Sequence, residues 1–207
     1  SDAFQNSTSR WNPQGGILFT PFTRTTLRFA YFQNLQTHFS ERVAPTHLYG
    51  FPLGQNESEM SHSTTFSLGW DQGFTNSGFL RSYAFWRDRR TPSLDFSEDP
   101  TLFDGKSYGG RIAYNQFLTD ELTLVPQYSV AHDLDLFGLR HDHEVSLALR
   151  YVHPRGVYVT LAENFLRQTG LLGTARTHVK AYTTDLEVSW EMPRKIGLAS
   201  LLSLIHI

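Results

Sequence analysis

The chain has 207 residues, no cysteine and a formal net charge of −2 at pH 7. Without cysteine there are no disulfides and no thiolate metal sites, and the near-neutral charge gives no electrostatic basis for binding nucleic acid. No apolar run approaches the ~18 residues of a transmembrane helix, and a mean hydropathy of −0.34 fits either a soluble protein or a membrane barrel in which only alternate residues face lipid.

Apolar and polar residues alternate with a period of two along most of the chain, which is the pattern of half-exposed β-strands. In chain order, we predict strands at residues 16–20, 27–32, 65–71, 79–87, 108–115, 122–130, 144–151, 157–164 and 185–190, and the start of a tenth after residue 197. The clearest pair is the hairpin at residues 108–131. Its arms reach about ten residues, against ~5–6 for an average strand, and a tilted strand needs that length to cross a bilayer.

The connections between these strands alternate between short and long. Short turns are predicted near residues 22–25, 73–76, 118–121, 153–156 and 193–197, and longer connections near 35–62, 88–106, 132–142 and 166–180. If the strands pair sequentially as a meander, all the short turns lie at one end, as in outer-membrane barrels. The alternative fold is a soluble β-sandwich or propeller, which has shorter strands and less one-sided loops. We therefore predict an all-β, antiparallel, up-and-down transmembrane β-barrel segment of about ten strands, an incomplete barrel.

The two phases of the alternation predict two faces. Charged and polar residues in one phase are expected to line the lumen: Arg28, Asp71, Arg111, Gln127, Glu144, Arg150, Asp185 and Glu187. Aromatic residues near strand ends in the other phase are expected to form a lipid-facing girdle: Tyr31, Trp70, Tyr114, Tyr128, Tyr151 and Trp190. Arg81 and Glu163 fall in the apolar phase, so each requires an interface position, a bulge or a different register.

One polar segment suggests chemistry. It contains Asp133, Asp135, His141, Asp142 and His143. These residue types could ligate a metal or form an Asp/His pair at the mouth, as in outer-membrane proteases, but they lack a specific ligand spacing, and the favoured interpretation is a solvated polar loop. We assign no catalytic residue, metal or cofactor, and we expect no enzyme activity.

A basic cluster at the outer end of a predicted strand contains Arg87, Asp88, Arg89 and Arg90. Arginine makes charge-assisted bonds with phosphate, so this cluster could bind lipopolysaccharide. The alternative is a solvated rim.

Residues 12–21, NPQGGILFTP, and 25–32, TTLRFAYF, resemble barrel strands of TonB-dependent-receptor-like outer-membrane proteins. Some porin-like relatives in that group are fused to tetratricopeptide repeats. Residues 190–201, WEMPRKIGLASL, look like the penultimate hairpin of such barrels. The resemblance implies a plug domain and an inner-membrane energy-coupling complex as partners. Since neither a plug nor a TonB box is visible, energy-coupled uptake is not carried over.

Residues 202–207, LSLIHI, match the translation of a common sequencing-library transposon end. We therefore expect a partial barrel over residues 1–201, an adaptor-derived tail over 202–207, and a missing remainder of the barrel as a partner.

The expected location is the outer membrane of a Gram-negative bacterium, in contact with lipid and lipopolysaccharide. The expected function is passage or uptake of a solute by a transporter or receptor. A barrel enzyme with its site at the mouth and a structural or secretion barrel remain the alternatives.

Overall fold

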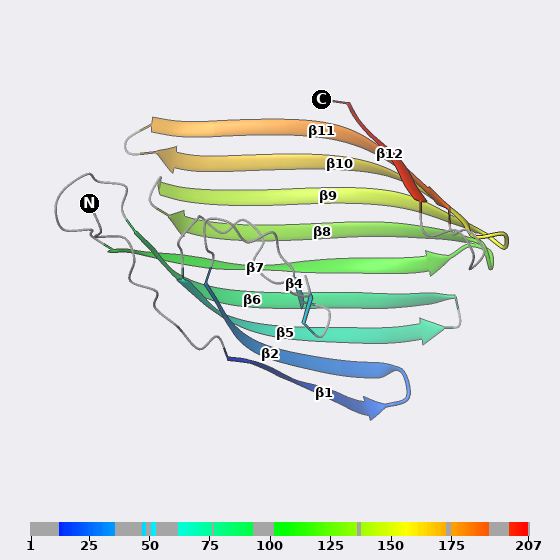
Figure 1. Cartoon of the computed structure of the whole chain (residues 1–207), viewed down its shortest axis with the longest axis horizontal. Helices are drawn as coiled ribbons and strands as arrows, with labels where there is room; N and C mark the ends of the chain where they lie inside the picture. The colour runs from blue at the N-terminus through cyan, green and yellow to red at the C-terminus, as the bar shows by residue number, and fades with distance from the viewer. Residues whose placement is uncertain are drawn as a thin grey trace.

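The computed structural model describes residues 13–35, 47–48, 51–52, 62–75, 77–92, 102–135, 138–172, 175–190 and 199–206. Every regular element in these ranges is a strand (Figure 1). The described part of the chain contains no helix of the length and hydropathy that membrane crossing requires.

Ten strands form one antiparallel sheet, and two short strands form a separate ladder. The sheet contains β1 (Gln14–Phe22), β2 (Thr25–Leu35), β5 (His62–Thr75), β6 (Gly78–Pro92), β7 (Leu102–Phe117), β8 (Leu122–Asp135), β9 (Gly138–His153), β10 (Val157–Leu172), β11 (Ala175–Trp190) and β12 (Ala199–His206). The small ladder pairs β3 (His47–Leu48) with β4 (Phe51–Pro52).

The predicted meander is confirmed, because each strand of the sheet pairs with the next in sequence apart from the β3–β4 insertion. The predicted turns between β1 and β2, β5 and β6, β7 and β8, and β9 and β10 lie at one end of the sheet (Figure 1). Gly156 closes the last of these with a φ of 81°, a conformation that glycine adopts without strain. The predicted turn at 193–197 lies outside the described residues.

Two predicted long connections are wrong. β8 continues to Asp135 and β9 begins at Gly138, while β10 continues to Leu172 and β11 begins at Ala175. Most of residues 132–142 and 166–180 are therefore paired strand. The connection predicted at 88–106 is also shorter, because β6 reaches Pro92 and β7 begins at Leu102. Backbone pairing continues through these segments although polar and apolar side chains do not alternate regularly there, because ladder hydrogen bonds do not depend on side-chain hydropathy.

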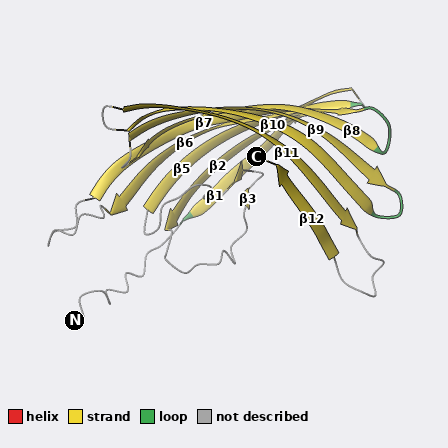
Figure 2. Ribbon diagram, turned by 90° about the horizontal axis from the view of Figure 1, so that it is seen from above, coloured by secondary structure: helices red, strands yellow, loops and turns green. Residues whose placement is uncertain are grey.

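The sheet is strongly curved and not closed (Figure 2). Within the described residues β1 pairs only with β2 and β12 only with β11. The β3 segment lies in the hollow of the arch (Figure 2), and Phe51 of the adjoining β4 contacts Arg28 and Tyr83. The face carrying Arg28 and Tyr83 is therefore the concave one, and it is called the inner face below. The opposite face is called the outer face.

Burial on these two faces is the reverse of that in a soluble sheet. Outer-face side chains such as Leu68, Val145 and Trp190 are 60, 51 and 48% exposed. Inner-face polar residues such as Thr65, Arg89 and Asp133 are 1, 6 and 9% exposed. A water-soluble protein buries its apolar face and rarely exposes a large contiguous apolar surface. This sheet does the opposite.

Candidate functional site

The strand register places the residues predicted for each face. Directly paired residues of neighbouring strands point to the same side of a sheet. By this register the eight residues predicted to line a lumen lie on the inner face, from Arg28 and Asp71 on β2 and β5 to Asp185 and Glu187 on β11. The six aromatic residues predicted as a girdle lie on the outer face.

The two exceptions in the apolar phase have different explanations. Arg81 lies on the inner face because it pairs in register with Asp71, and its Nε is 3.7 Å from an Asp71 carboxylate oxygen. The apolar phase assigned to β6 was therefore wrong, since Phe79 and Tyr83 lie on the inner face as well. Glu163 does lie on the outer face, where its carboxylate accepts a 3.0 Å hydrogen bond from the Thr184 hydroxyl.

The inner face holds a group of buried ion pairs. Asp133 of β8 is bonded to Arg140 of β9 at 2.8 Å and lies 3.7 Å from Arg89 of β6. Arg89 also donates a 3.0 Å hydrogen bond to the Ser107 hydroxyl. Arg140 is in addition 3.0 Å from Asp142 on its own strand. The Asp133 carboxylate therefore links an arginine on β6 with an arginine on β9, two strands that are separated by β7 and β8.

Further polar contacts extend this group along β5 to β10. Asp142 accepts a 2.9 Å hydrogen bond from Gln168, and Arg87 donates a 3.1 Å hydrogen bond to Thr65. We call Arg87, Arg89, Asp133, Arg140 and Asp142 the arginine–carboxylate cluster. It lines a cavity of about 440 Å³ whose wall also includes Tyr83, Phe85 and Glu144. The cavity therefore presents donors, acceptors and aromatic rings together.

A second inner-face group holds the β3–β4 hairpin. Phe51 is 1% exposed, its ring lies 4.8 Å from the Arg28 guanidinium carbon, and it meets Tyr83 edge-on at 5.9 Å. Arg28 in turn bonds to Asp71 at 2.9 Å. A side chain at Gly69 would come within 3.0 Å of both Arg28 and Phe51. Because Gly69 has no side chain, there is room for the Phe51 ring beside Arg28.

The predicted His/Asp segment does not form one site. Asp133 and Asp142 lie on the inner face, whereas His141 and His143 lie on the outer face. The side chain of Asp135 is outside the described part. Because neighbouring residues of a strand point to opposite sides, this sequence cluster is divided by the sheet. The metal and protease hypotheses both fail on that geometry.

The predicted basic cluster at 87–90 is divided in the same way. Arg87 and Arg89 lie on the inner face and are buried, while Asp88 and Arg90 lie on the outer face. Arg90 pairs with Asp104 at 3.2 Å in solvent. The four residues therefore do not form one phosphate-binding rim.

Sequence reasoning missed the arginine–carboxylate cluster as a unit. Its members come from segments interpreted as loops or rim, and only the sheet register brings them together. One signal was available, because Arg87 and Arg89 share their phase with Tyr83 and Phe85. That signal could be used only once the structure showed that Tyr83 and Phe85 of β6 lie on the inner face. Of the residues predicted to line the lumen, Arg111 contacts Gln127 and Glu144 accepts a 3.0 Å hydrogen bond from Ser129.

The chemistry available at the cluster is recognition by hydrogen bonding. Planar guanidinium groups and carboxylates offer fixed donors and acceptors, and Tyr83 and Phe85 offer apolar surface beside them. Such a lining suits a small solute rich in polar groups. In comparisons with known proteins, neither a family model nor a curated protein matches this chain.

Proposed function

We propose that this chain forms part of the wall of an outer-membrane barrel of a Gram-negative bacterium, with its outer face in lipid and its inner face along the path of a polar solute. The observation that carries the proposal is the reversed burial, with exposed apolar side chains outside and buried charges inside. Lipid is the solvent in which such an outer face is stable, because apolar side chains there avoid water.

Most exposed apolar residues of the outer face form an oblique band, and three leucines lie one outer-face rung above it, Leu134, Leu139 and Leu171. Its upper edge, the side away from the short turns, is one rung of paired residues on four strands: Tyr31, Phe66, Trp86 and Tyr108. On β11 the residue in register with this rung is His178, and the first apolar outer-face residue toward the short turns is Tyr182. The lower edge is Trp70 on β5 and Trp190 on β11. The residue of β11 in register with Trp70 is Tyr182, so the lower edge on β11 lies closer to the short turns than the register alone would place it.

This offset gives the tilt of the strands relative to the band. On β2 the lower edge is Leu27, which is in register with Trp70, so both shifts are counted over the seven inter-strand steps from β2 to β11: four residues (178 to 182) at the upper edge and eight (182 to 190) at the lower edge, a mean of six. With ~3.4 Å per residue and ~4.8 Å between strands, the shift is about 20 Å over about 34 Å, a tilt of about 30°. Strands of membrane barrels tilt by roughly 35–45°. A level bilayer would therefore cover this band.

The inner face supplies the functional side of the proposal. The arginine–carboxylate cluster and its cavity would contact the solute, and Arg111, Glu144 and Arg150 would contribute to the charge of the path. Charged groups lining an aqueous path determine which ions pass, as in channels generally. The Phe51 hairpin would narrow the path beside β5 and β6.

The edge strands imply further wall. Unpaired backbone groups in lipid cost several kcal/mol each, so the edges at β1 and at β11 require pairing strands from the same protein or another copy, because most of β12 is the expected adaptor-derived tail. The resemblance of residues 12–32 to TonB-dependent-receptor-like barrels adds a plug domain and an energy-coupling complex as proposed partners.

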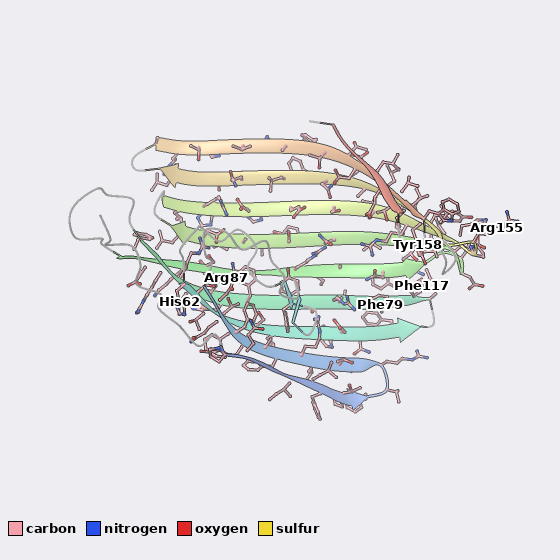
Figure 3. The ribbon with its side chains drawn as sticks, viewed as in Figure 1. His62, Phe79, Arg87, Phe117, Arg155 and Tyr158 are labelled. Carbon is pink, nitrogen blue, oxygen red and sulfur yellow. The ribbon has the colours of Figure 1, made fainter. Side chains whose placement is uncertain are left out.

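The test is ion selectivity of the protein assembled in planar bilayers. Arg150→Ala removes a positive charge from the inner face, so the reversal potential in a salt gradient is expected to shift toward cation preference. Arg155→Ala is the matched control, because Arg155 lies in the turn beyond the band (Figure 3). A folded Arg150→Ala protein with an unchanged reversal potential would contradict an inner-face path and favour a structural or secretion barrel. Absence of membrane insertion would contradict the membrane assignment itself.

The barrel-enzyme alternative has lost the residues on which it depended, since Asp142 and His143 point to opposite faces. No other observation favours it.

A further inference from the structure

A cationic patch lies on the outer face directly above the apolar band. Arg167 of β10 is paired in register with His143 of β9 and with Lys180 of β11. One rung farther from the short turns, His141 and His178 flank Thr169, and Arg176 follows on β11. We call Arg167, Lys180 and Arg176 the cationic patch, and His143 and His178 lie beside it. All five are exposed.

No carboxylate balances this patch on its own face. At the outer positions of β9, β10 and β11 the one carboxylate is Glu163, four residues from Arg167 along β10. That separation is about 13 Å along a strand, too far for an ion pair. Within the described residues Arg167 and Lys180 form no ion pair or side-chain hydrogen bond.

The cross-strand pair of Arg167 and Lys180 is unfavourable by itself. Like charges directly opposite each other on neighbouring strands destabilise a sheet, with β-carbons only about 5 Å apart. Such a spacing lets both cations reach one anionic group placed between them. An external anion would convert the repulsion into two charge-assisted contacts. The patch therefore requires an anion that the described sheet does not supply.

The surface immediately below the patch is apolar. Phe165 and Tyr182 are the next paired residues toward the short turns, with ring centroids 4.7 Å apart, and Val145 completes their rung. A ligand matching both rungs carries a negative charge above a hydrocarbon part. A free phosphate ion would use only the upper rung, whereas a membrane lipid uses both.

We propose that the cationic patch binds the phosphate-bearing headgroup of an anionic lipid, in the leaflet away from the short turns, while its acyl chains lie on Phe165 and Tyr182. This rests on the proposed membrane function. Among the described residues of β10 and β11, the opposite end of the outer face offers no equivalent, because Val157 and Trp190 occupy its last paired rung and Arg155 is the cation in the adjoining turn (Figure 3).

The experiment compares spin-labelled phosphatidylglycerol with spin-labelled phosphatidylcholine around the protein in phosphatidylcholine vesicles. The immobilised fraction is expected to favour phosphatidylglycerol, and the preference is expected to fall by about fivefold for each cation removed, in Arg167→Gln and Lys180→Gln. Arg155→Gln is expected to retain the full preference. Arg167→Lys, which keeps the charge, is expected to retain most of it and shows that position 167 tolerates substitution.

Two results separate the failure of this inference from that of the proposed function. If lipid is immobilised but phosphatidylglycerol is not preferred, or if the double Gln variant keeps the preference, the headgroup site is refuted and the membrane wall stands. If no lipid is immobilised and brominated lipids do not quench Trp86 or Trp190, the membrane assignment is refuted, and the headgroup site with it.

Discussion

At the scale of single residues, Asp133 is the most consequential side chain of the inner face. Its carboxylate contacts Arg140 at 2.8 Å and Arg89 at 3.7 Å, and its side chain is 13% exposed. A buried ion pair contributes little compared with an apolar replacement, but the removal of one partner leaves an uncompensated charge. Here the loss of the Asp133 carboxylate would leave Arg89 without its ion pair, whereas Arg140 keeps Asp142 at 3.0 Å.

We expect Asp133→Asn to lower the free energy of unfolding by up to roughly 3–5 kcal/mol, because the buried Arg89 loses its carboxylate. The measurement is urea-induced unfolding of the lipid-inserted protein. Asp104→Asn is the matched control, since its pair with Arg90 has side chains 72 and 65% exposed and should contribute less than about 1 kcal/mol. Equal effects of the two substitutions would show that the inner-face pair is as solvated as the surface one.

At the scale of elements, each strand has two faces with different tolerances. Leu147 and Ser146 are neighbours on β9, but Leu147 lies outside and is 49% exposed, whereas Ser146 lies inside and is 9% exposed. The same backbone segment thus has an apolar side in the proposed lipid and a polar side in the proposed path.

Leu147→Arg is expected to cost roughly 2–4 kcal/mol, because Leu147 lies near the middle of the apolar band. Ser146→Arg should be tolerated far better, since an inner-face arginine can remain hydrated or find a polar partner. A folding titration into lipid vesicles measures both variants. Similar costs at the two positions would refute the assignment of the faces.

The β3–β4 hairpin depends on space left by β5. Gly69→Val should displace Phe51 and Arg28, because a β-carbon there already lies 3.0 Å from each, and the expected loss of stability is about 1–3 kcal/mol. Gly15→Val on β1 is the control, since a β-carbon there meets no atom within 4 Å. Thermal unfolding distinguishes the two. Full stability in Gly69→Val would mean that the hairpin contributes nothing at this contact.

At the scale of the whole molecule, the oblique band predicts the depth of individual side chains. Trp86 lies on the upper edge, Trp190 on the lower edge, and Leu147 near the middle. The three positions are on different strands, so their relative depths depend on the tilt of the entire sheet and not on local structure.

In single-tryptophan proteins with the other tryptophans replaced by phenylalanine, we expect Trp86 and Trp190 to be quenched best by lipids brominated near the headgroup. A tryptophan introduced by Leu147→Trp should be quenched best by lipids brominated near the chain ends. The reason is that aromatic edges lie at the two interfaces and residue 147 lies between them. Deep quenching of Trp190 would contradict the derived tilt.

The sequence alone determined the strands, the sequential pairing and most of the two faces. Period-two alternation and polar turns such as residues 118–121 are local signals, and they decide where a strand runs and which residues share a side. Thus Glu144 and Arg150 could be placed with Arg111 on one face before the register was known. The family resemblance stays a prediction.

Only the tertiary structure decided the rest. β6 carries aromatics on its inner face, so hydropathy assigned Arg81 to the wrong side, and the pairing with Asp71 corrected it. Residues 132–142 mix Leu134 and Leu139 with His132 and His141 on the outer face, so the alternation was unclear and they appeared to be a loop, yet backbone hydrogen bonds extend the sheet through most of them. The arginine–carboxylate cluster, the cationic patch and the tilt all arise from cross-strand register. Register is determined by pairing between distant segments, which local alternation does not encode.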